Sequence, residues 1–302
     1  MKKFLSLTLT LLLTMAIFTG YAAAEASYKD TVKKLVIAYL PNEQTEDLAE
    51  ARGLMQGAMS EYLGIPVGEF NSVDYNATVE AMRTGHADLA YFGPLTYVQA
   101  ARRANAEALV IAADGGDVTK SGYYSLFVVK ADSELQSIED LVGCTFGFVD
   151  PNSTSGNLVP TYELMMKFDL TNDEIHTNGK LFESVIFTGT HPNSIQAVLH
   201  GDVDAAAIAS DTLASQINLG IIEESDLRII HTSDWIPSSP MAIRGDLPQD
   251  LKDAVLEFLL AYDNSEYFER MLGQKEGQTF RWTMIDDTNY DYVRGLVEAT
   301  SD

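Results

Sequence analysis

The sequence predicts an α/β protein with two similar lobes, each built on an open sheet that helices cover. Two observations carry this prediction. First, short runs of β-branched and aromatic residues alternate with helical patterns along the chain, which is typical of parallel sheets with helices on their faces. Second, the segment from Val79 to Phe92 recurs as Ile195 to Ile208, which indicates that one structural unit occurs twice.

Each element follows from its own local pattern. Runs of apolar, β-branched or aromatic residues predict strands at 35–39, 88–92, 108–113, 124–130, 145–149 and 205–209. Apolar residues at helical spacing predict helices at 47–62, 156–168, 193–200, 248–262 and 264–272. From about Leu247 onward the pattern is mainly helical.

Each copy of the repeat consists of a helix, a glycine and an aspartate that opens an apolar strand. The glycines are Gly85 and Gly201, and the aspartates are Asp88 and Asp204. Glycine suits the left-handed position that ends a helix. Helix–glycine–strand units are common in α/β proteins, so a chance match is the alternative, but the constant offset of the matching residues favours a true repeat.

The repeat also predicts a cleft. Ligands of open α/β sheets bind beyond the carboxyl ends of the strands, and two facing lobes would place those ends around one cleft. Tyr75 and His191 occupy equivalent positions, each four residues before the repeated segment. We therefore expect both side chains to project into the cleft from opposite sides.

The first residues read as an export signal, predicted to span residues 1–24. Lys2 and Lys3 precede an apolar stretch at 4–18, which is shorter than the roughly 20 residues of a membrane-spanning helix. An uncleaved membrane anchor is the alternative. Cleavage is expected after Ala24 or Ala26. A lipoprotein would carry a cysteine near the cleavage point, and this sequence has none there. The mature chain is expected to be free in the periplasm of a double-membraned bacterium.

Charge narrows the range of partners. The formal net charge is −24, which argues against nucleic acid or an anionic membrane as a partner, because both require a basic surface. If the ligand is an anion, groups at the binding site itself must attract it, because the net charge of the protein does not. The single cysteine, Cys144, leaves no internal disulfide and is expected to be a buried small hydrophobe. We expect a monomer.

The strongest local signal is the segment 148–156, where an apolar strand runs into a turn and a helix start. Ser153, Thr154 and Ser155 lie at that start. The first N–H groups of a helix lack internal partners and carry partial positive charge, so they bind phosphate-like anions without a Lys or Arg. The three hydroxyls add neutral donors. An ordinary Ser/Thr helix cap is the alternative interpretation.

Other neutral donors accompany this segment. His191 could bind an anionic oxygen as imidazolium or as a neutral donor, or could be a structural residue. The tyrosines near predicted strand ends offer hydroxyl donors or simply pack. The sequence contains no GxxxxGK[ST] loop, HExxH, GxSxG or cysteine cluster. The five histidines lack metal-ligand spacing, so we predict no cofactor and no metal.

Six segments in order resemble one known family. They are Asp74-Tyr75, Tyr91-Phe92-Gly93-Pro94, Gly122-Tyr123, Asp150-Pro151-Asn152-Ser153-Thr154-Ser155-Gly156, Gly189-Thr190-His191 and Ile236-Pro237-Ser238-Ser239-Pro240. Together they look like the PhnD-like periplasmic phosphonate-binding proteins of ABC importers, a group that includes phosphite binders. The resemblance implies a two-lobed, type II-like periplasmic-binding-protein fold with two crossovers, one lobe from 29–123 plus 241–302 and the other from 124–240.

The resemblance also implies the ligand contacts. The residues expected to hold the oxyanion are Tyr75, Tyr123, Ser153, Thr154, Ser155 and His191. Members that bind aminoethylphosphonate use two carboxylates for the ammonium, and the matching positions here are Asp211 and Ser239. Because Ser239 is uncharged, we expect a ligand with a small uncharged substituent, such as phosphite or methylphosphonate. Asp211 could instead accept a hydrogen bond from a protonated ligand oxygen.

The implied mechanism is a clamshell that captures an oxyanion and delivers it to the permease subunits of an ABC transporter. A binder of phosphate or another oxyanion is one alternative. A periplasmic sensor that signals to a membrane kinase is another, and the sequence does not separate them. An enzyme acting on a phosphoryl compound is the rival of a different class.

Overall fold

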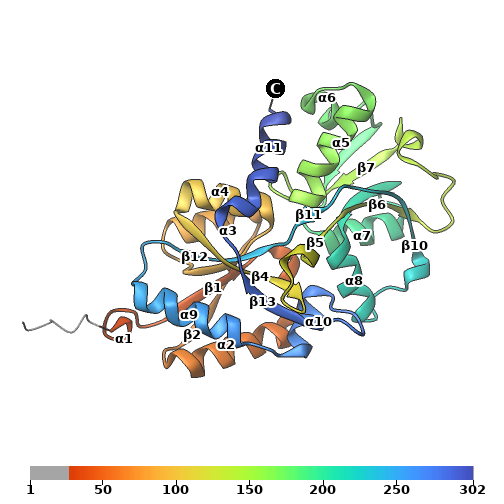
Figure 1. Cartoon of the computed structure of the whole chain (residues 1–302). Helices are drawn as coiled ribbons and strands as arrows, with labels where there is room; N and C mark the ends of the chain where they lie inside the picture. Colours follow the sequence, from red (N-terminus) through yellow and green to blue (C-terminus); the bar gives the residue numbers. More distant parts are fainter. Residues whose placement is uncertain (1–26, 302) are drawn as a thin grey trace, which may run out of the picture.

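A computed structural model describes residues 27–301 of the chain, so the predicted signal peptide lies outside the described residues. Two lobes lie side by side, one around a six-stranded sheet and the other around a five-stranded sheet (Figure 1). Between residues 27 and 301, no helix has the length and apolar character needed to cross a membrane.

Five neighbouring strands of the first sheet correspond in order to the five strands of the second, and β13 is an additional strand at the edge of the first. The first runs β13-β4-β12-β3-β1-β2 and the second runs β10-β6-β9-β7-β8. The strands of the first are β1 (Leu35–Tyr39), β2 (Val67–Asn71), β3 (Leu89–Tyr91), β4 (Ala106–Asp114), β12 (Pro240–Arg244) and β13 (Phe280–Met284). Those of the second are β6 (Ser125–Lys130), β7 (Thr145–Phe148), β8 (Ser184–Phe187), β9 (Ala205–Ala209) and β10 (Leu227–Thr232).

The prediction of parallel sheets is wrong for part of each sheet. β1 pairs in parallel with β2 and β3, and β7 pairs in parallel with β8 and β9. β12 and β6, however, run antiparallel to both of their neighbours. Each of these strands comes directly from a crossing between the lobes, so it runs away from the cleft while the parallel strands run towards it.

The crossings themselves form a small two-stranded ribbon. It consists of β5 (Gly122–Tyr123) and β11 (Ile236–Pro237), which pair antiparallel. At Gly122 a Cβ atom would lie 2.0 Å from the indole nitrogen of Trp235, so a larger residue at this position of the ribbon would displace the Trp235 side chain, which is exposed. The ribbon places Tyr123 at the junction of the two lobes.

Helices cover both faces of both sheets (Figure 1). In β1, Leu35 and Ile37 face one apolar layer and Ala38 faces the other, as the alternation of a strand requires. The helices of the first lobe are α1 (Tyr28–Thr31), α2 (Ala49–Leu63), α3 (Tyr75–Arg83), α4 (Pro94–Ala104), α9 (Gln249–Ala261), α10 (Ser265–Leu272) and α11 (Asp291–Ala299). Those of the second are α5 (Val159–Phe168), α6 (Asn172–His176), α7 (His191–His200) and α8 (Ser210–Asn218).

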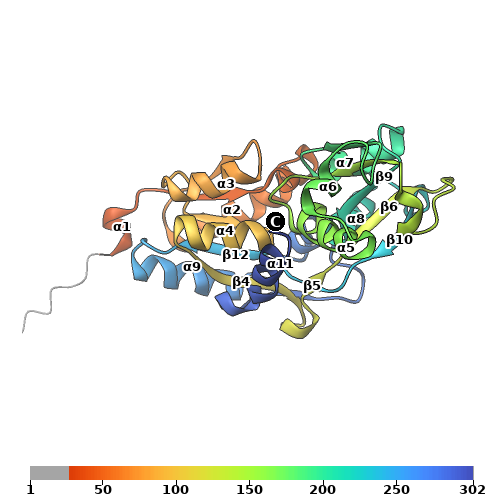
Figure 2. The ribbon, with the colours of Figure 1, turned by 90° about the horizontal axis from the view of Figure 1, so that it is seen from above.

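The C-terminal helix α11 contacts both lobes. It packs against α4 of the first lobe and α5 of the second, and Figure 2 shows it between them. Leu296 of α11 shares an apolar cluster with Val159 of α5. The side-chain amide of Asn172 donates to the carbonyl oxygen of Thr300 at 2.9 Å. These contacts hold the lobes close together in the structure.

The repeat predicted from the sequence is structural. Asp88 accepts the N–H of Val36 at 3.0 Å, and Asp204 accepts the N–H of Thr145 at 2.7 Å. Val36 lies in β1 and Thr145 opens β7, so each repeat aspartate binds the neighbouring parallel strand of its own sheet. β1 and β7 are therefore equivalent strands, and each is held by a hydrogen bond to the aspartate of its own repeat.

Most predicted elements are present with shifts of one or two residues at their ends. The prediction omitted the strands β2, β5, β8, β10, β11, β12 and β13, and it omitted the helices α1, α4, α6, α8 and α11. The strand β13 interrupts the C-terminal part that the pattern predicted as mainly helical.

Candidate functional site

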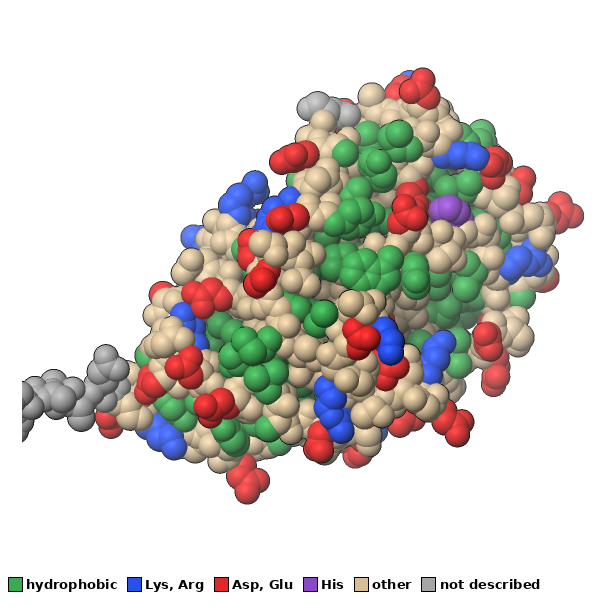
Figure 3. All heavy atoms as spheres, viewed as in Figure 1, with side chains coloured by type: hydrophobic (Ala, Val, Ile, Leu, Met, Phe, Trp, Pro, Cys, Tyr) green, Lys and Arg blue, Asp and Glu red, His purple; other side chains and the backbone are tan. Residues whose placement is uncertain are grey.

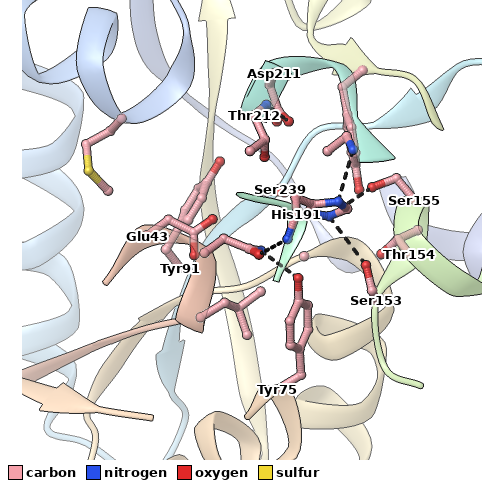
Figure 4. A pocket seen from close by; sticks show the side chains of 16 residues that line it. Glu43, Tyr75, Tyr91, Ser153, Thr154, Ser155, His191, Asp211, Thr212 and Ser239 are labelled. Carbon is pink, nitrogen blue, oxygen red and sulfur yellow. Dashed lines mark hydrogen bonds between the residues drawn. The ribbon is translucent and has the colours of Figure 1, made fainter. Parts of the chain in front are cut away.

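A pocket lies where the parallel strands of both sheets end, as expected for open α/β sheets. Figure 4 shows its lining side chains. All eight residues singled out from the sequence line it: Tyr75, Tyr123, Ser153, Thr154, Ser155, His191, Asp211 and Ser239. The other lining residues are Leu40, Asn42, Glu43, Tyr91, Gly93, Ala209, Thr212 and Met271. Both lobes therefore contribute to one pocket.

The helix start after β7 has an unusual first turn. The prediction placed the helix at 156–168, but a wider π-type turn (Thr154–Leu158) precedes α5. Ser153 caps this turn, because its hydroxyl oxygen accepts the N–H of Gly156 at 3.0 Å. By helix geometry, the N–H groups of Thr154 and Ser155 have no acceptor within the helix. They are free to point their partial positive charge into the pocket.

Gly156 is required for this turn. A Cβ atom there would lie 2.4 Å from a methyl carbon of Val149 and 2.8 Å from the Ser153 hydroxyl oxygen. The backbone of the turn thus approaches the end of β7 more closely than any larger residue allows. The close approach presents the hydroxyls of three consecutive residues to one place.

The hydroxyl of Thr154 has a second role. Its Oγ1 atom accepts the N–H of Leu95, in α4 of the other lobe, at 2.9 Å. The hydroxyl hydrogen of Thr154 is still available to donate. Thr154 therefore joins the two lobes at the edge of the pocket as well as lining it.

His191 is the first residue of α7 and is buried, with 4% of its surface exposed. Its Nδ1 atom accepts the N–H of Ala209 at 3.1 Å. Since Nδ1 is an acceptor, the proton of the neutral ring is on Nε2. Burial lowers the pKa of His191 to about 3, so the ring is neutral at ordinary pH. Nε2 lies 3.5 Å from the hydroxyl oxygens of both Ser153 and Ser155.

Tyr75 occupies the equivalent position on the other side, as the first residue of α3. Its hydroxyl oxygen accepts from the side-chain amide of Asn42 at 2.5 Å. The carbonyl oxygen of the Asn42 side chain accepts the backbone N–H of His191 at 2.9 Å. Asn42 thus links the two residues that the repeat places opposite each other. Burial raises the pKa of Tyr75 well above its ordinary value, so its hydroxyl keeps the proton that it can donate.

Two further tyrosines line the pocket from the junction of the lobes. Tyr123 lies in β5 and Tyr91 ends β3. Burial raises the pKa of each, and the charge of Asp211 raises it further. Both hydroxyls are therefore neutral donors. Ser239, between the ribbon and β12, lies beside them.

Two carboxyl groups also line the pocket. Asp211 is the residue that the sequence identified, and burial raises its pKa to about 6. Glu43, in the single turn Pro41–Glu43 after β1, was missed by the sequence analysis. Burial and the charge of Asp211 raise the pKa of Glu43 to about 8. The pocket therefore contains a second carboxyl group, although Ser239 is uncharged.

Asn42 and Glu43 could have been found from one signal. They directly follow the end of β1, and the carboxyl ends of parallel strands face the ligand in open α/β sheets. The residues that follow the strand at 145–149 were predicted to bind the ligand, whereas those that follow the strand at 35–39 were not considered. Within residues 27–301, no group of three or more His, Cys, Asp or Glu side chains could hold a metal ion.

The fold and pocket define a two-lobed solute-binding protein. Residues 37–290 match the family described as the ABC transporter, phosphonate, periplasmic substrate-binding protein. The chain is 28% identical to the phosphonates-binding periplasmic protein of Escherichia coli, over 93% of this chain and 80% of that one. It is 30% identical to the phosphate-import protein PhnD of Mycolicibacterium smegmatis, over 88% of this chain and 85% of that one. The chain belongs to this family of periplasmic substrate-binding proteins.

Solved structures support the fold. A binding protein component of an ABC phosphonate transporter from Pseudomonas aeruginosa matches with a TM-score of 0.76 and 26% identity, over 87% of this chain and 85% of that one. PhnD1 from Prochlorococcus marinus, in complex with methylphosphonate, matches with a TM-score of 0.74 and 24% identity, over 88% of this chain and 97% of that one. The prediction of a two-lobed periplasmic-binding-protein fold is confirmed.

Proposed function

We propose that this chain is the binding component of an ABC importer for phosphonate-type oxyanions such as phosphite, methylphosphonate or a similar small phosphonate. The observation that carries the proposal is the ring of uncharged donors around the pocket. Those donors are the helix-start amides with the hydroxyls of Ser153, Thr154 and Ser155, the Nε2–H of His191, and the hydroxyls of Tyr75 and Tyr123. Burying an anion is favourable only where its oxygens are hydrogen-bonded.

Because the surface of the protein is acidic, an anion must be held by hydrogen-bond donors within the pocket. Figure 3 shows acidic side chains spread over both lobes, in keeping with the net charge of −24. A negatively charged ligand gains no attraction from the molecule as a whole. Fixed N–H and O–H groups act at short range, so they bind the anion without a basic residue.

In this proposal the pocket closes as a clamshell. The lobes are 29–123 plus 241–302 and 124–240, and the ribbon of β5 and β11 is the hinge. The anion first meets the helix start of the second lobe, and Tyr75 and Asn42 of the first lobe then close over it. The closed protein delivers its ligand to permease subunits in the membrane, and the mature chain acts in the periplasm as a monomer.

The pocket is proposed to bind without bond-making chemistry. The spacing of His191 from Ser153 and Ser155 resembles that of a serine nucleophile and its base. A base must accept the hydroxyl proton, but the Nε2 atom that faces the serines already carries the ring proton, because Nδ1 accepts from Ala209. The lowered pKa of His191 makes the ring a poor base as well. The geometry therefore favours binding over hydrolysis.

Phosphate is the second candidate ligand. The relative from Mycolicibacterium smegmatis carries the name of a phosphate-import protein, and the same donors suit a phosphate ion. Titration calorimetry of the ligand-free protein with phosphite, methylphosphonate, phosphate and sulfate tests both candidates. The proposal expects the tightest binding for phosphite or methylphosphonate. Tight binding of phosphate alone would replace it with the second candidate.

A further inference from the structure

The two lobes also meet through a pair of helices. α8 of the second lobe packs against α10 of the first (Figure 1). The hydroxyl of Ser215 donates to the carbonyl oxygen of Arg270 at 2.5 Å. The side-chain amide of Asn218 donates to the carbonyl oxygen of Gln274 at 3.3 Å. Leu219, at the end of α8, packs against the apolar core of the first lobe. These residues form a contact between the lobes that we call the α8–α10 seam.

Gly273 caps the C-terminal end of α10 and lies against the backbone of α8. A Cβ atom at Gly273 would lie 2.9 Å from the carbonyl oxygen of Asp211 and 3.2 Å from the backbone nitrogen of Ser215. Both of these atoms belong to the main chain of α8, so no side-chain rotation can make room for a methyl group. A larger residue at this position must push α8, and the second lobe with it, away from the first lobe.

The left-handed backbone of Gly273 does not by itself account for the glycine. Its φ angle is 65°, which glycine adopts easily at the end of a helix. Asn105 and Asp169 end α4 and α5 with φ angles of 51° and 56°. A helix of this chain can therefore end in that conformation with a side chain present. The additional constraint at Gly273 is the main chain of the other lobe.

The α8–α10 seam borders the ligand pocket. Asp211, in the first turn of α8, lines the pocket, and so does Met271 of α10. Movement of α8 away from α10 would therefore separate two walls of the pocket. When a ligand binds only the closed form of a protein, its apparent affinity falls in proportion to the fraction of the protein that can close.

We propose that Gly273 determines how far the lobes close, because its missing side chain lets α8 settle on α10 and so completes the pocket around the ligand. Gly273 acts through the position of α8 and is a positioning residue. This inference rests on the proposed function and identifies a contact on which its clamshell depends. Since every ligand requires the same closure, Gly273 controls the affinity for all ligands and not the choice between them.

Gly273→Ala tests the proposal, and Gly201→Ala is the matched control. Gly201 caps α7 with a φ angle of 78° and has nothing within 4 Å of its Cβ position. Both substitutions place alanine in a left-handed conformation, but only Gly273→Ala meets the other lobe. Titration calorimetry of the full mature chain with methylphosphonate, phosphite and phosphate is the measurement. Gly273→Ala is expected to weaken every ligand that the wild type binds by one common factor of at least about ten.

Gly201→Ala should keep the wild-type affinities within about twofold, because its strain is the same in the open and the closed form. Small-angle X-ray scattering provides a second measurement. Saturating ligand is expected to lower the radius of gyration of the wild type and of Gly201→Ala, and to lower that of Gly273→Ala by less. Wild-type affinities in Gly273→Ala would overturn the proposal. A loss of affinity for one ligand with none for another would also overturn it, because closure affects all ligands alike.

Ser215→Ala reaches the seam from α8 and keeps the end of α10 intact, so it serves if Gly273→Ala does not fold. Loss of the hydrogen bond to Arg270 is expected to weaken all ligands about three- to tenfold, again by one factor. Wild-type affinities in Ser215→Ala would then refute the proposal. If the wild type binds none of the three ligands, the proposed function fails and this inference fails with it. If the wild type binds them and Gly273→Ala behaves like Gly201→Ala, only this inference fails.

Discussion

The Nδ1 atom of His191 accepts the backbone N–H of Ala209 at 3.1 Å. This single bond ties the start of α7 to the end of β9 and fixes the tautomer of the ring. It makes His191 a neutral donor aimed at the space between Ser153 and Ser155. The account of an acidic protein that holds an anion with uncharged groups depends on this arrangement.

The tautomer can be observed directly. Nitrogen-15 NMR of the imidazole should show a proton on Nε2 of His191 and none on Nδ1, with no titration between pH 8 and pH 4, because the pKa is about 3. In the unfolded chain a histidine titrates near 6.5. The unfolded state thus binds the proton first as the pH falls, and the stability due to the neutral ring is complete above pH 6.5 and lost between 6.5 and 3. A ring that titrates near pH 6.5 in the folded protein would contradict the assignment.

Asn42 is expected to control how long the closed form persists. It links Tyr75 of the first lobe to His191 of the second, so Asn42→Ala should raise the dissociation rate of every ligand about tenfold, in line with the loss of one to two buried hydrogen bonds. Stopped-flow measurement of ligand release provides the readout. Gln99→Ala is the control, because Gln99 joins the lobes outside the pocket through one bond to Asn152 at 2.9 Å. An equal effect of the two variants would remove the special role of Asn42.

The first turn of the helix should not tolerate a side chain at Gly156. Gly156→Ala places a methyl group against Val149 and Ser153, and crowding of this kind costs about 1–3 kcal/mol of unfolding free energy. Ligand binding should weaken at least about tenfold as the turn shifts. Gly57→Ala is the matched control, since Gly57 lies in the exposed part of α2 with nothing near its Cβ position. It should stabilise the protein slightly. Denaturant unfolding and calorimetry of the same samples compare the two variants.

The aspartate of each repeat is expected to stabilise its own lobe. Asp204→Ala removes the acceptor for the backbone N–H and the hydroxyl of Thr145, both at 2.7 Å, and should cost about 1.5–3 kcal/mol as hydrogen bonds to a charged group are lost. Asp202→Ala, two residues away on the exposed turn, should change stability by less than about 0.5 kcal/mol. Urea unfolding of both variants measures the difference. Equal stabilities would show that Asp204 does not hold β7.

The sequence predicted the fold well where patterns are local. The strands at 35–39 and 205–209 match β1 and β9 in full, because each is a compact apolar run. It missed β12 and β13 and the antiparallel part of both sheets. Pairing of β12 depends on where the chain returns after crossing between lobes, and no local pattern reports that.

The site was predicted to a similar degree. The segment 153–155 was recognised from three consecutive hydroxyl residues at a predicted helix start. The repeat places Tyr75 and His191 at equivalent positions, which predicted that both face the cleft. Glu43 gives no such signal, since one glutamate among many in an acidic chain is ordinary. Its place in the pocket comes from the turn after β1, and its raised pKa comes from burial and from Asp211 on the opposite lobe. Contacts between lobes are set by closure, and a linear sequence does not show them.

A crystal structure of the mature protein with methylphosphonate tests the central claim most directly. The account predicts the phosphonate oxygens within hydrogen-bonding distance, about 2.6–3.1 Å, of the hydroxyls and amides at residues 153–155 and of Nε2 of His191. A ligand held by Lys or Arg side chains, or bound away from residues 153–155, would contradict it.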